Sequence, residues 1–508
     1  MRAPSMPPQI SIITPSLNQG AFLKCALDSV ARQRDVAVEH IVFDAGSIDG
    51  SRGLLRAWAQ RGPGRRAVLE PDDGPASAIN KGFACAKSEV IGWLCADDAY
   101  ADDSALHAVV EAFERDPACD IVYGRSAYMD ENGARVRGGP YLSDPAKAAE
   151  TLRAGPAFLQ PAVFIRRALL GRIGLLDASY RHAFDFEFWL RAAQAGARLL
   201  PLDREIAHKR MHAESSSALS AGVVAMDCAR ATRQHMGRAG GAWVARAVRA
   251  DVAGAGDAAA KVAAAVERRL NRDNAADFLT VLGNGPSLTG FDFTQLHGVD
   301  AIGMNAAYRY WREIDWHPRY YACLDTVVGL SHGDEIAAMI AGAESLGIDA
   351  FLLRENLIET LSPEARTSPR VISFDELAAQ GGVLDLHPIT TGSHAALFGA
   401  LLGYRTMCLL GVDCNYVERV EGAQPRGGVE LELVETPDYN PNYYFDSYQQ
   451  AGDRYNAPNP VPDLHLQCWR SAAARLAGRG VSVWNASRTS RVDVFVRRSF
   501  SQRMASAV

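Results

Sequence analysis

Residues 70–100, EPDDGPASAINKGFACAKSEVIGWLCADDAY, decide how the first half of the chain is interpreted. They join a carboxylate-rich loop to a helical segment and then to a short apolar run, residues 90–95. An apolar run of this length predicts a buried strand, and Asp97 and Asp98 follow it closely. In an open α/β sheet, ligands bind at the carboxyl ends of the strands. Two carboxylates there can hold a divalent cation, although on their own they also fit an ordinary acidic turn.

The length and composition predict a globular protein of two domains. The chain has 508 residues, more than one hydrophobic core usually serves. Hydrophobic residues make up 48%, charged residues 22%, and the net charge is -6, which gives no indication of nucleic-acid binding. The nine cysteines are scattered, which favours reduced thiols and argues against a structural zinc site. Without a signal-peptide core or a membrane-spanning segment, we expect a cytoplasmic protein whose membrane association, if any, is peripheral.

The first part of the chain alternates strands and helices. Residues 10–14 form a β-branched run that leads into a loop containing Ser16 and then a helical pattern. Residues 38–43 repeat this arrangement and end at Asp44. The carboxylate of Asp44 can accept hydrogen bonds from a base or ribose in the crevice of an α/β sheet. Capping of the following helix is an equally good interpretation.

Four motifs stand in a characteristic order: ITPSLNQGAFLKCALDSVARQ, HIVFDAGSIDGS, the segment of residues 70–100, and HAFDFEFWLRAAQAG. With them, residues 9–215 resemble the family 2 glycosyltransferases of the GT-A fold. The resemblance implies that Ser16 and Asp44 hold the nucleotide. It also implies that Asp72 and Lys81 belong to the donor site.

The same resemblance implies a metal site and a catalytic base. Asp98 is implied as a direct ligand of Mg²⁺ or Mn²⁺, with Asp97 beside it facing the sugar or ribose. Such a cation stabilises the charge of a leaving diphosphate. The base that takes the proton of the acceptor hydroxyl is assigned to Asp185, with Glu187 as the alternative. His212 is a further candidate for the metal shell, although a histidine in a basic loop is often only solvated.

The second half again places polar residues after strands. Residues 276–282 run into a glycine-rich loop that contains Asn284, and residues 299–304 end at Asn305. A glycine-rich loop permits close approach of a phosphate or ribose, although this pattern is not specific by itself. A further candidate anion site lies at a helix N-terminus and consists of Thr391, Gly392 and Ser393.

The motifs LGNGPSL, GMNAAY, TTGSHAALFGALLGYRTMCLLGVDCNY, NPNYYFDSY and LHLQCWRSAAARL occur in this order. With them, residues 276–500 resemble family 42 sialyltransferases and Maf-type bacterial glycosyltransferase domains. The resemblance implies a CMP-activated acidic sugar, sialic acid-like or Kdo-like, as donor, with no metal cofactor. Asn284 and Asn305 are implied to hold the cytidine and phosphate, and residues 391–393 to contact the phosphate or sugar.

In that scheme Tyr443 and Tyr444 hydrogen-bond the leaving phosphate, and His465 is the general base. A histidine suits this role because it titrates near neutrality. The alternatives are aromatic packing for the two tyrosines and a structural hydrogen bond for His465.

We therefore expect an α/β protein with a GT-A domain at residues 1–220, a helical connector at 221–275 and a second Rossmann-like domain at 276–508. The favoured function is a bifunctional glycosyltransferase for a bacterial surface polysaccharide or glycoconjugate. Its first domain is predicted to transfer a hexose-type sugar from a UDP- or dTDP-sugar with inversion, and its second an acidic sugar from a CMP-sugar, to a glycan or glycolipid acceptor. One alternative is a single active transferase with a glycan-binding second domain, and another is a nucleotide-sugar-binding scaffold of a membrane assembly.

Overall fold

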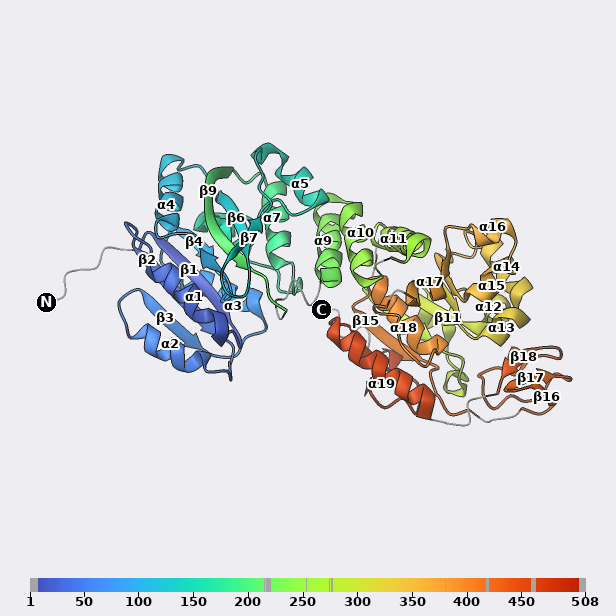
Figure 1. Cartoon of the computed structure of the whole chain (residues 1–508). Coiled ribbons are helices and arrows are strands. Elements are labelled where there is room, and N and C mark those ends of the chain that lie inside the picture. The colour runs from blue at the N-terminus through green and yellow to red at the C-terminus, as the bar shows by residue number, and fades with distance from the viewer. Residues whose placement is uncertain are drawn as a thin grey trace. The chain divides into compact units, whose positions relative to one another are not determined.

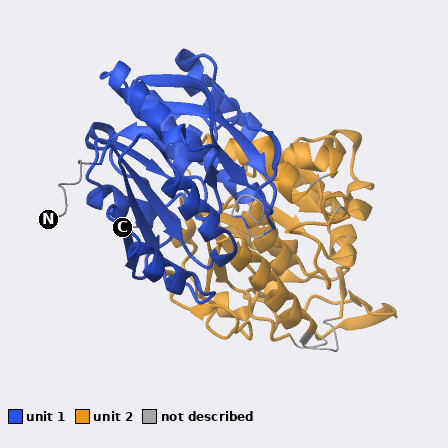
Figure 2. Cartoon of the chain, turned by 60° about the vertical axis from the view of Figure 1, so that its left-hand side comes forward, with its two compact units in different colours: residues 1–243 blue, residues 244–508 orange. Residues whose placement is uncertain are grey.

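The protein folds into two compact units, residues 1–243 and 244–508 (Figure 2). The computed structural model describes residues 8–213, 215, 221–252, 254–273, 275, 277–379, 381–416, 420–457 and 463–501. In that part of the chain, no helix combines the length and the apolar character needed to cross a membrane. Each unit is built around a sheet with helices packed on it, so the prediction of two α/β domains is confirmed.

The described strands of the first unit form one mixed sheet in the order β3-β2-β1-β4-β8-β6-β9-β5, with β7 paired to β6 (Figure 1). The pairs β1–β2, β2–β3, β1–β4 and β6–β9 are parallel, and the remaining pairs are antiparallel. The strands are β1 (Ile10–Ser16), β2 (Val38–Asp44), β3 (Arg65–Leu69), β4 (Val90–Trp93), β5 (Ala99–Tyr100), β6 (Ile121–Met129), β7 (Arg135–Gly138), β8 (Val163–Arg166) and β9 (Leu199–Arg210).

Helices cover both faces of this sheet. The helices of this unit are α1 (Gly20–Ala31), α2 (Ser51–Ala59), α3 (Pro75–Cys85), α4 (Ala105–Arg115), α5 (Ala148–Ala154), α6 (Arg167–Ile173), α7 (Phe184–Gln194) and α9 (Ala221–Met236), of which α9 packs against α7. Helices α1 and α4 share a core with Ile10 and Ile12 of β1. On the opposite face, α3 lies directly on β1, because a Cβ at Gly82 would come within 2.5 Å of the Ile13 side chain. The side chain of Trp93 stacks on Trp189 of α7 with ring centroids 5.1 Å apart.

The second unit contains a sheet in the order β14-β13-β12-β11-β10-β15-β19-β20, in which all described pairs are parallel. Its strands are β10 (Phe278–Leu282), β11 (Asp300–Met304), β12 (Tyr320–Cys323), β13 (Ala350–Leu353), β14 (Val371–Ser373), β15 (Thr406–Leu410), β19 (Ser482–Asn485) and β20 (Val496–Arg497). A small antiparallel sheet is formed by β16 (Ala423–Gly427), β17 (Glu430–Leu433) and β18 (Arg454–Asn456).

The connector predicted at residues 221–275 is helical. It contains α9, α10 (Gly241–Asp251) and α11 (Gly256–Leu270), and the division of the chain into two units falls within α10, between residues 243 and 244. The other helices of the second unit are α12 (Tyr308–Glu313), α13 (Thr326–Ser331), α14 (Gly333–Ala341), α15 (Glu355–Ile358), α16 (Pro363–Arg366), α17 (Phe374–Ala378), α18 (Thr391–Leu401) and α19 (Asp463–Gly478).

A buried histidine on β2 makes the first unit sensitive to acid. His40 is 3% exposed, its Nε2 lies 2.9 Å from Oγ1 of Thr14, and its ring packs edge-on against Trp58. Burial, with a smaller contribution from the charge of Arg65, lowers the pKa of His40 from 6.5 to about 3. Between pH 6.5 and about pH 3, the unfolded chain therefore binds a proton on His40 that the folded chain does not bind. The free energy of unfolding falls there as the pH falls, by at most about 1.4 kcal/mol per pH unit.

We predict that His40→Gln reduces this acid sensitivity. Between about pH 7 and about pH 5, the wild type should lose roughly 2 kcal/mol more stability than the variant. Calorimetric melting of the whole chain across this range measures the difference. His107→Gln is the matched control, because His107 is a half-exposed histidine of the same unit, and it should follow the wild type. Parallel curves for His40→Gln and the wild type would contradict the prediction.

Candidate functional site

The acidic pair of the first unit lies where the order of its sheet reverses. Strand β1 has β2 on one side and β4 on the other, and both pair with it in parallel. Asp97 and Asp98 follow β4, so they stand at the carboxyl edge beside the reversal point, where α/β sheets bind ligands. The carbonyl oxygen of Trp93 accepts a 2.6 Å hydrogen bond from Nε2 of Gln160, which anchors the start of this turn.

Arg210, at the end of β9, holds the turn from the other side. Its main-chain N–H donates to Oδ1 of Asp98 (2.9 Å), and its Nε donates to the carbonyl oxygen of Asp97 (2.8 Å). Its Nη1 donates to the carbonyl oxygens of Asp130 and Glu131, at 3.0 and 2.8 Å. Arg210 is 3% exposed, so its guanidinium is a structural link between three segments.

The buried carboxylate of Asp98 is electrostatically strained. Burial, and then the neighbouring charge of Asp97, raise the pKa of Asp98 well above its ordinary value, and Lys209 opposes this shift. A divalent cation relieves such repulsion between carboxylates, and carboxylate oxygens are suitable ligands for it.

His212 is brought to the same place. Its Nε2 lies 3.1 Å from Oδ2 of Asp97, and its ring packs on Phe22 with centroids 4.6 Å apart. The sulfur of Cys95 completes the group, because the ligand atoms of Cys95, Asp97 and Asp98 all lie within 4.8 Å of one another. Burial, and then the charges of Asp98 and Asp97, raise the pKa of Cys95. The oxygen, nitrogen and sulfur donors together fit a divalent cation.

Asp185 lies in the first turn of α7 and shares an electrostatic neighbour with the acidic pair. Burial raises the pKa of Asp185, and the positive charge of Lys209 opposes the rise. Burial by itself lowers the pKa of Lys209, but the carboxylates of Asp98 and Asp185 outweigh it and raise that pKa. Lys209 was not among the predicted site residues. Its local sequence carries no signal for this position, which arises from the pairing of β9 with β5 and β6.

Glu187 serves the helix packing. It is 1% exposed, and its Oε1 accepts hydrogen bonds from Nε of Arg191 (2.8 Å) and Nε2 of His235 (2.8 Å). Burial raises the pKa of Glu187, but the hydrogen bonds from His235 and Arg191 outweigh it and lower that pKa. The hydrogen bond from His235 ties α7 to α9, and the choice between Asp185 and Glu187 as the base stays a prediction.

The carboxylate of Asp44 is occupied by its own loop. Oδ1 accepts from the N–H groups of Gly46 (3.1 Å) and Ser47 (2.9 Å), and Oδ2 accepts from the hydroxyls of Ser47 (2.6 Å) and Ser16 (3.3 Å). Asp44 is completely buried. Asp44 does not cap the following helix α2, whose N-cap residue is Gly50 and which has no side-chain cap, and the contact of Asp44 with a nucleotide stays a prediction.

The EPDDG and NKG motifs contact each other, and the donor-site roles of Asp72 and Lys81 stay predictions. Nζ of Lys81 donates to Oε1 of Glu70 (3.0 Å) and to the carbonyl oxygen of Pro71 (3.1 Å). Oδ1 of Asp72 accepts from the N–H of Gly74 (2.9 Å). Lys81 keeps 39% of its side chain exposed, so it is accessible to a ligand.

The second unit has its own reversal point, between β10 and β15. Asn284 follows β10, and its Nδ2 donates to the carbonyl oxygen of Met304 (3.2 Å) and to the hydroxyl of Tyr448 (3.0 Å). Its Oδ1 is buried and has no hydrogen-bond partner among the described residues. Asn305, which follows β11, has a left-handed backbone conformation (φ 55°). Its Oδ1 is also buried and accepts no hydrogen bond from any described residue.

Asp413 extends this polar group. It follows β15, is 3% exposed, and its Oδ2 accepts from the N–H of Ser287 (2.7 Å). A Cβ at Gly285 would lie 2.3 Å from this oxygen, so only glycine fits there. Oδ1 of Asp413 and Oγ of Ser287 are buried without a hydrogen-bond partner in the described part of the chain. Buried polar atoms in this state usually await a ligand or water.

The predicted aromatic and basic groups lie along the same edge. The rings of Tyr443 and Tyr448 stack with centroids 3.6 Å apart, and Tyr448 is the partner of Asn284. The ring of His465 lies 5.7 Å from that of Tyr416, and burial lowers the pKa of His465. Tyr416 was not predicted, although it stands in the quoted motif GVDCNY.

Three other predicted residues are engaged in packing. Ser393 is fully buried, and its Oγ lies 2.7 Å from Oγ1 of Thr390 and 2.9 Å from Sγ of Cys468. Thr391 accepts a 3.3 Å hydrogen bond from the N–H of Leu324. A Cβ at Gly392 would approach Trp469 to 3.2 Å. The contacts of these residues pack α18 against its neighbours, and their contact with a phosphate stays a prediction.

Tyr444 lies in the aromatic core of the second unit. Its ring stacks on Phe293 with centroids 5.7 Å apart and meets Tyr310 edge-on at 5.1 Å. Its hydroxyl is buried and has no hydrogen-bond partner among the residues described. The packing alternative therefore accounts for its ring, and a contact between its hydroxyl and a phosphate stays a prediction.

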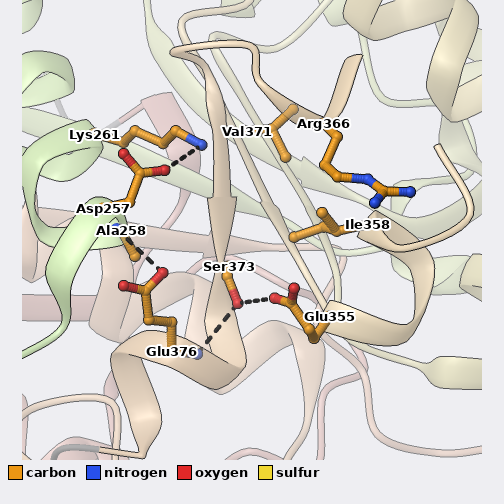
Figure 3. Close-up of a pocket in the computed structure, with 9 residues that line it drawn as sticks. All are labelled: Asp257, Ala258, Lys261, Glu355, Ile358, Arg366, Val371, Ser373 and Glu376. Atoms are coloured by element: carbon orange, nitrogen blue, oxygen red, sulfur yellow. Dashed lines mark hydrogen bonds and ion pairs between the residues drawn. The ribbon is translucent and has the colours of Figure 1, made fainter. Parts of the chain in front are cut away.

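A cavity of about 140 Å³ lies elsewhere in the second unit, between α11, β14 and α17 (Figure 3). Nζ of Lys261 pairs with Asp257 at 2.8 Å, and Oγ of Ser373 donates to Oε2 of Glu355 at 2.6 Å. None of the predicted site residues lines this cavity. Since none of the predicted site residues lies there, we assign this cavity no ligand.

Comparison with known proteins identifies the first unit. The sequence model described as glycosyl transferase family 2 matches residues 11–174. The crystal structure of S. aureus TarS 1-349 in complex with UDP is similar at 18% identity and a TM-score of 0.35, covering 47% of this chain and 70% of that fragment.

Two relatives define the relationship further. An uncharacterized glycosyltransferase of Nostoc sp. is 28% identical over 179 residues, 33% of this chain and 54% of the relative. The PGL/p-HBAD biosynthesis glycosyltransferase of Mycobacterium bovis (strain BCG / Pasteur 1173P2) is 33% identical over 188 residues, 36% of this chain and 69% of the relative. The chain therefore belongs to glycosyl transferase family 2.

Proposed function

We propose that the first unit transfers a hexose-type sugar from a UDP- or dTDP-sugar to a hydroxyl group of a glycan or glycolipid, with inversion. The observation that supports this most directly is the group formed by Asp97, Asp98 and His212 at the reversal point of the sheet. Asp185 shares the electrostatic environment of this group through Lys209. Family membership supports the same reaction class.

In this reaction the acceptor oxygen forms a bond to the anomeric carbon of the donor sugar, while the bond from that carbon to the diphosphate breaks. Asp185 accepts the proton of the attacking hydroxyl, and its raised pKa makes it a stronger base than an ordinary carboxylate. Inversion requires this base on the side of the sugar opposite the leaving group. Lys209 contributes a positive charge near the bond that forms and the diphosphate that leaves.

Asp98, Asp97 and His212 are the residues that would hold a divalent cation. When bound, Mg²⁺ or Mn²⁺ supplies charge that stabilises the leaving diphosphate. Arg210 keeps the turn of the two aspartates in place through its hydrogen bonds to both. Asp72 and Lys81 are proposed to contact the donor from the neighbouring loop.

The acceptor belongs, in our proposal, to a bacterial surface polysaccharide or glycoconjugate. The name of the mycobacterial relative places that protein in PGL/p-HBAD biosynthesis, a glycoconjugate-type role. For the chain described here we propose cytoplasmic action with peripheral contact to the membrane where a lipid-linked acceptor is presented.

We further propose that the second unit is a separate transferase for a CMP-activated acidic sugar. The supporting observation is the set of unpartnered buried oxygens at its reversal point, on Asn284, Asn305 and Asp413. His465 is the proposed base, and Tyr443 and Tyr444 are the phenols proposed to bind the leaving phosphate. Tyr416 lies beside His465. Two transferases on one chain raise the local concentration of each product at the next site.

Two alternatives are tested together with this proposal. In one, the second unit binds the acceptor glycan and carries out no chemistry. In the other, the whole chain is a nucleotide-sugar-binding scaffold of a membrane assembly.

Asp185→Asn and Glu187→Gln together distinguish the proposed base, Asp185, from Glu187, which serves helix packing. For Asp185→Asn we expect kcat to fall by about a hundredfold to ten-thousandfold, because the proton of the acceptor is no longer removed, with little change in KM for the donor. Its melting temperature should stay close to that of the wild type. Glu187→Gln should behave in the opposite way, with a lower melting temperature, because Arg191 and His235 lose their buried counter-charge. Turnover by Asp185→Asn at the wild-type rate would exclude Asp185 as the base.

Asp98→Ala and His465→Ala separate the two proposed sites. We expect Asp98→Ala to abolish incorporation from radiolabelled UDP- or dTDP-sugars and to leave incorporation from CMP-sugars unchanged. His465→Ala should give the reverse pattern. Thermal stabilisation by CMP, amounting to about 2.7 kcal/mol at a hundred times Kd, provides a binding readout for the second unit.

Each outcome distinguishes the alternatives. If no CMP-sugar is consumed but glycan stabilises the protein, the second unit is a binding domain. If neither class of sugar is transferred by the wild type while nucleotides still bind, the scaffold alternative holds.

A further inference from the structure

A thiol lies among the proposed metal ligands of the first unit. Sγ of Cys95 and the carboxylate oxygens of Asp97 and Asp98 are within 4.8 Å of one another, a spacing that one cation can bridge. His212 joins them through Asp97, at 3.1 Å. The available donor set is therefore one sulfur, two carboxylates and one imidazole, rather than the all-oxygen set that Mg²⁺ prefers.

The position of this thiol is fixed by its surroundings. Cys95 follows β4, whose last residue, Trp93, is completely buried and stacked on Trp189. Gln160 is 8% exposed, and it holds the carbonyl oxygen of Trp93 with its Nε2 while its Oε1 lies 3.8 Å from Sγ of Cys95. The side-chain amide of Gln160 thus accepts from the thiol and keeps the sulfur on the side of the acidic pair.

Sulfur and imidazole ligands change which metal ions a site prefers to bind. Thiolate ligands favour Zn²⁺ and other soft or borderline ions, whereas carboxylate and water ligands suit Mg²⁺ and Mn²⁺. Mixed sites of sulfur, nitrogen and carboxylate oxygen are typical of four-coordinate Zn²⁺.

We propose that Cys95 is a metal ligand that gives this site a preference for thiophilic divalent ions such as Zn²⁺ and Co²⁺ over Mg²⁺. The inference rests on the proposed function of the first unit, because it concerns the same cation site. On binding, the thiol releases its proton to solvent and the sulfur donates a lone pair to the ion, with no change of oxidation state. The identity of the bound ion then depends on which ions are available to the protein.

The test uses the full-length protein and metal ions alone. We expect Co²⁺ to produce a near-ultraviolet sulfur-to-cobalt charge-transfer band in the wild type. Cys95→Ser should lose that band and bind Zn²⁺ at least about tenfold more weakly in calorimetric titration, because it loses a ligand. Its affinity for Mn²⁺ should change by less than about threefold, because the oxygen ligands are retained.

Matched controls exclude adventitious thiols and misfolding. Cys85 is a half-buried cysteine of the same unit that lies outside the cluster, so Cys85→Ser should keep both the band and the affinity for Zn²⁺. Cys95→Ala should reproduce the loss seen with Cys95→Ser. The metal-free melting temperatures of all variants show whether each one is folded.

Two results would overturn the proposal. One is a charge-transfer band that persists in a folded Cys95→Ser protein, and the other is an unchanged affinity of that variant for Zn²⁺. These results would leave the proposed transferase function intact as long as Mn²⁺ binds and supports transfer. Failure of every divalent ion to bind the wild type would instead remove the metal-dependent function itself, and this inference with it.

Discussion

A carboxylate can be buried only if hydrogen bonds or charges replace the water that it loses, and Asp98 shows how the first unit meets this requirement. Its partner is the main-chain N–H of Arg210, which comes from a strand more than a hundred residues later in the chain. The guanidinium of the same residue binds the carbonyl oxygens of the turn and of the β6–β7 hairpin. The acidic turn therefore acquires its shape only when β9 has paired with β5 and β6.

The sheets of the two units share a reversal of strand order, but the polar residues beside that reversal differ in kind. Both place polar residues after the two strands that flank a reversal of strand order. The first unit gathers carboxylates, a histidine and a thiol there, which suits a cation. The second gathers amide, hydroxyl and carboxylate oxygens that lack partners among the described residues, which suits the hydrogen-bonding edge of a base or sugar.

Much of this arrangement could be predicted from local pattern. Apolar runs such as residues 90–95, followed at once by polar residues, indicate buried parallel strands, and acids after them indicate a ligand edge. What could not be predicted depends on distant pairing. Lys209 and Gln160 reach the site only through β9 and through the segment before β8, and their local sequence carries no signal of this.

The roles of some residues were ambiguous for a different reason. Aspartate and serine both cap turns and bind nucleotides, so the sequence could not separate these roles for Asp44 or Ser393. Their hydrogen bonds to the loop and to α19 respectively are visible only in three dimensions. Tyr444 shows the same ambiguity between an aromatic core residue and a phenol donor.

The fully parallel sheet of the second unit also affects how the chain is made. Its two central strands, β10 and β15, pair Leu282 with Leu410, roughly 130 residues apart. During synthesis β11 can pair with one side of β10 early, whereas the other side of β10 stays unpaired until β15 has been made. Because pairing between distant segments is slow, we expect the two halves of this sheet to join late in the folding of the second unit.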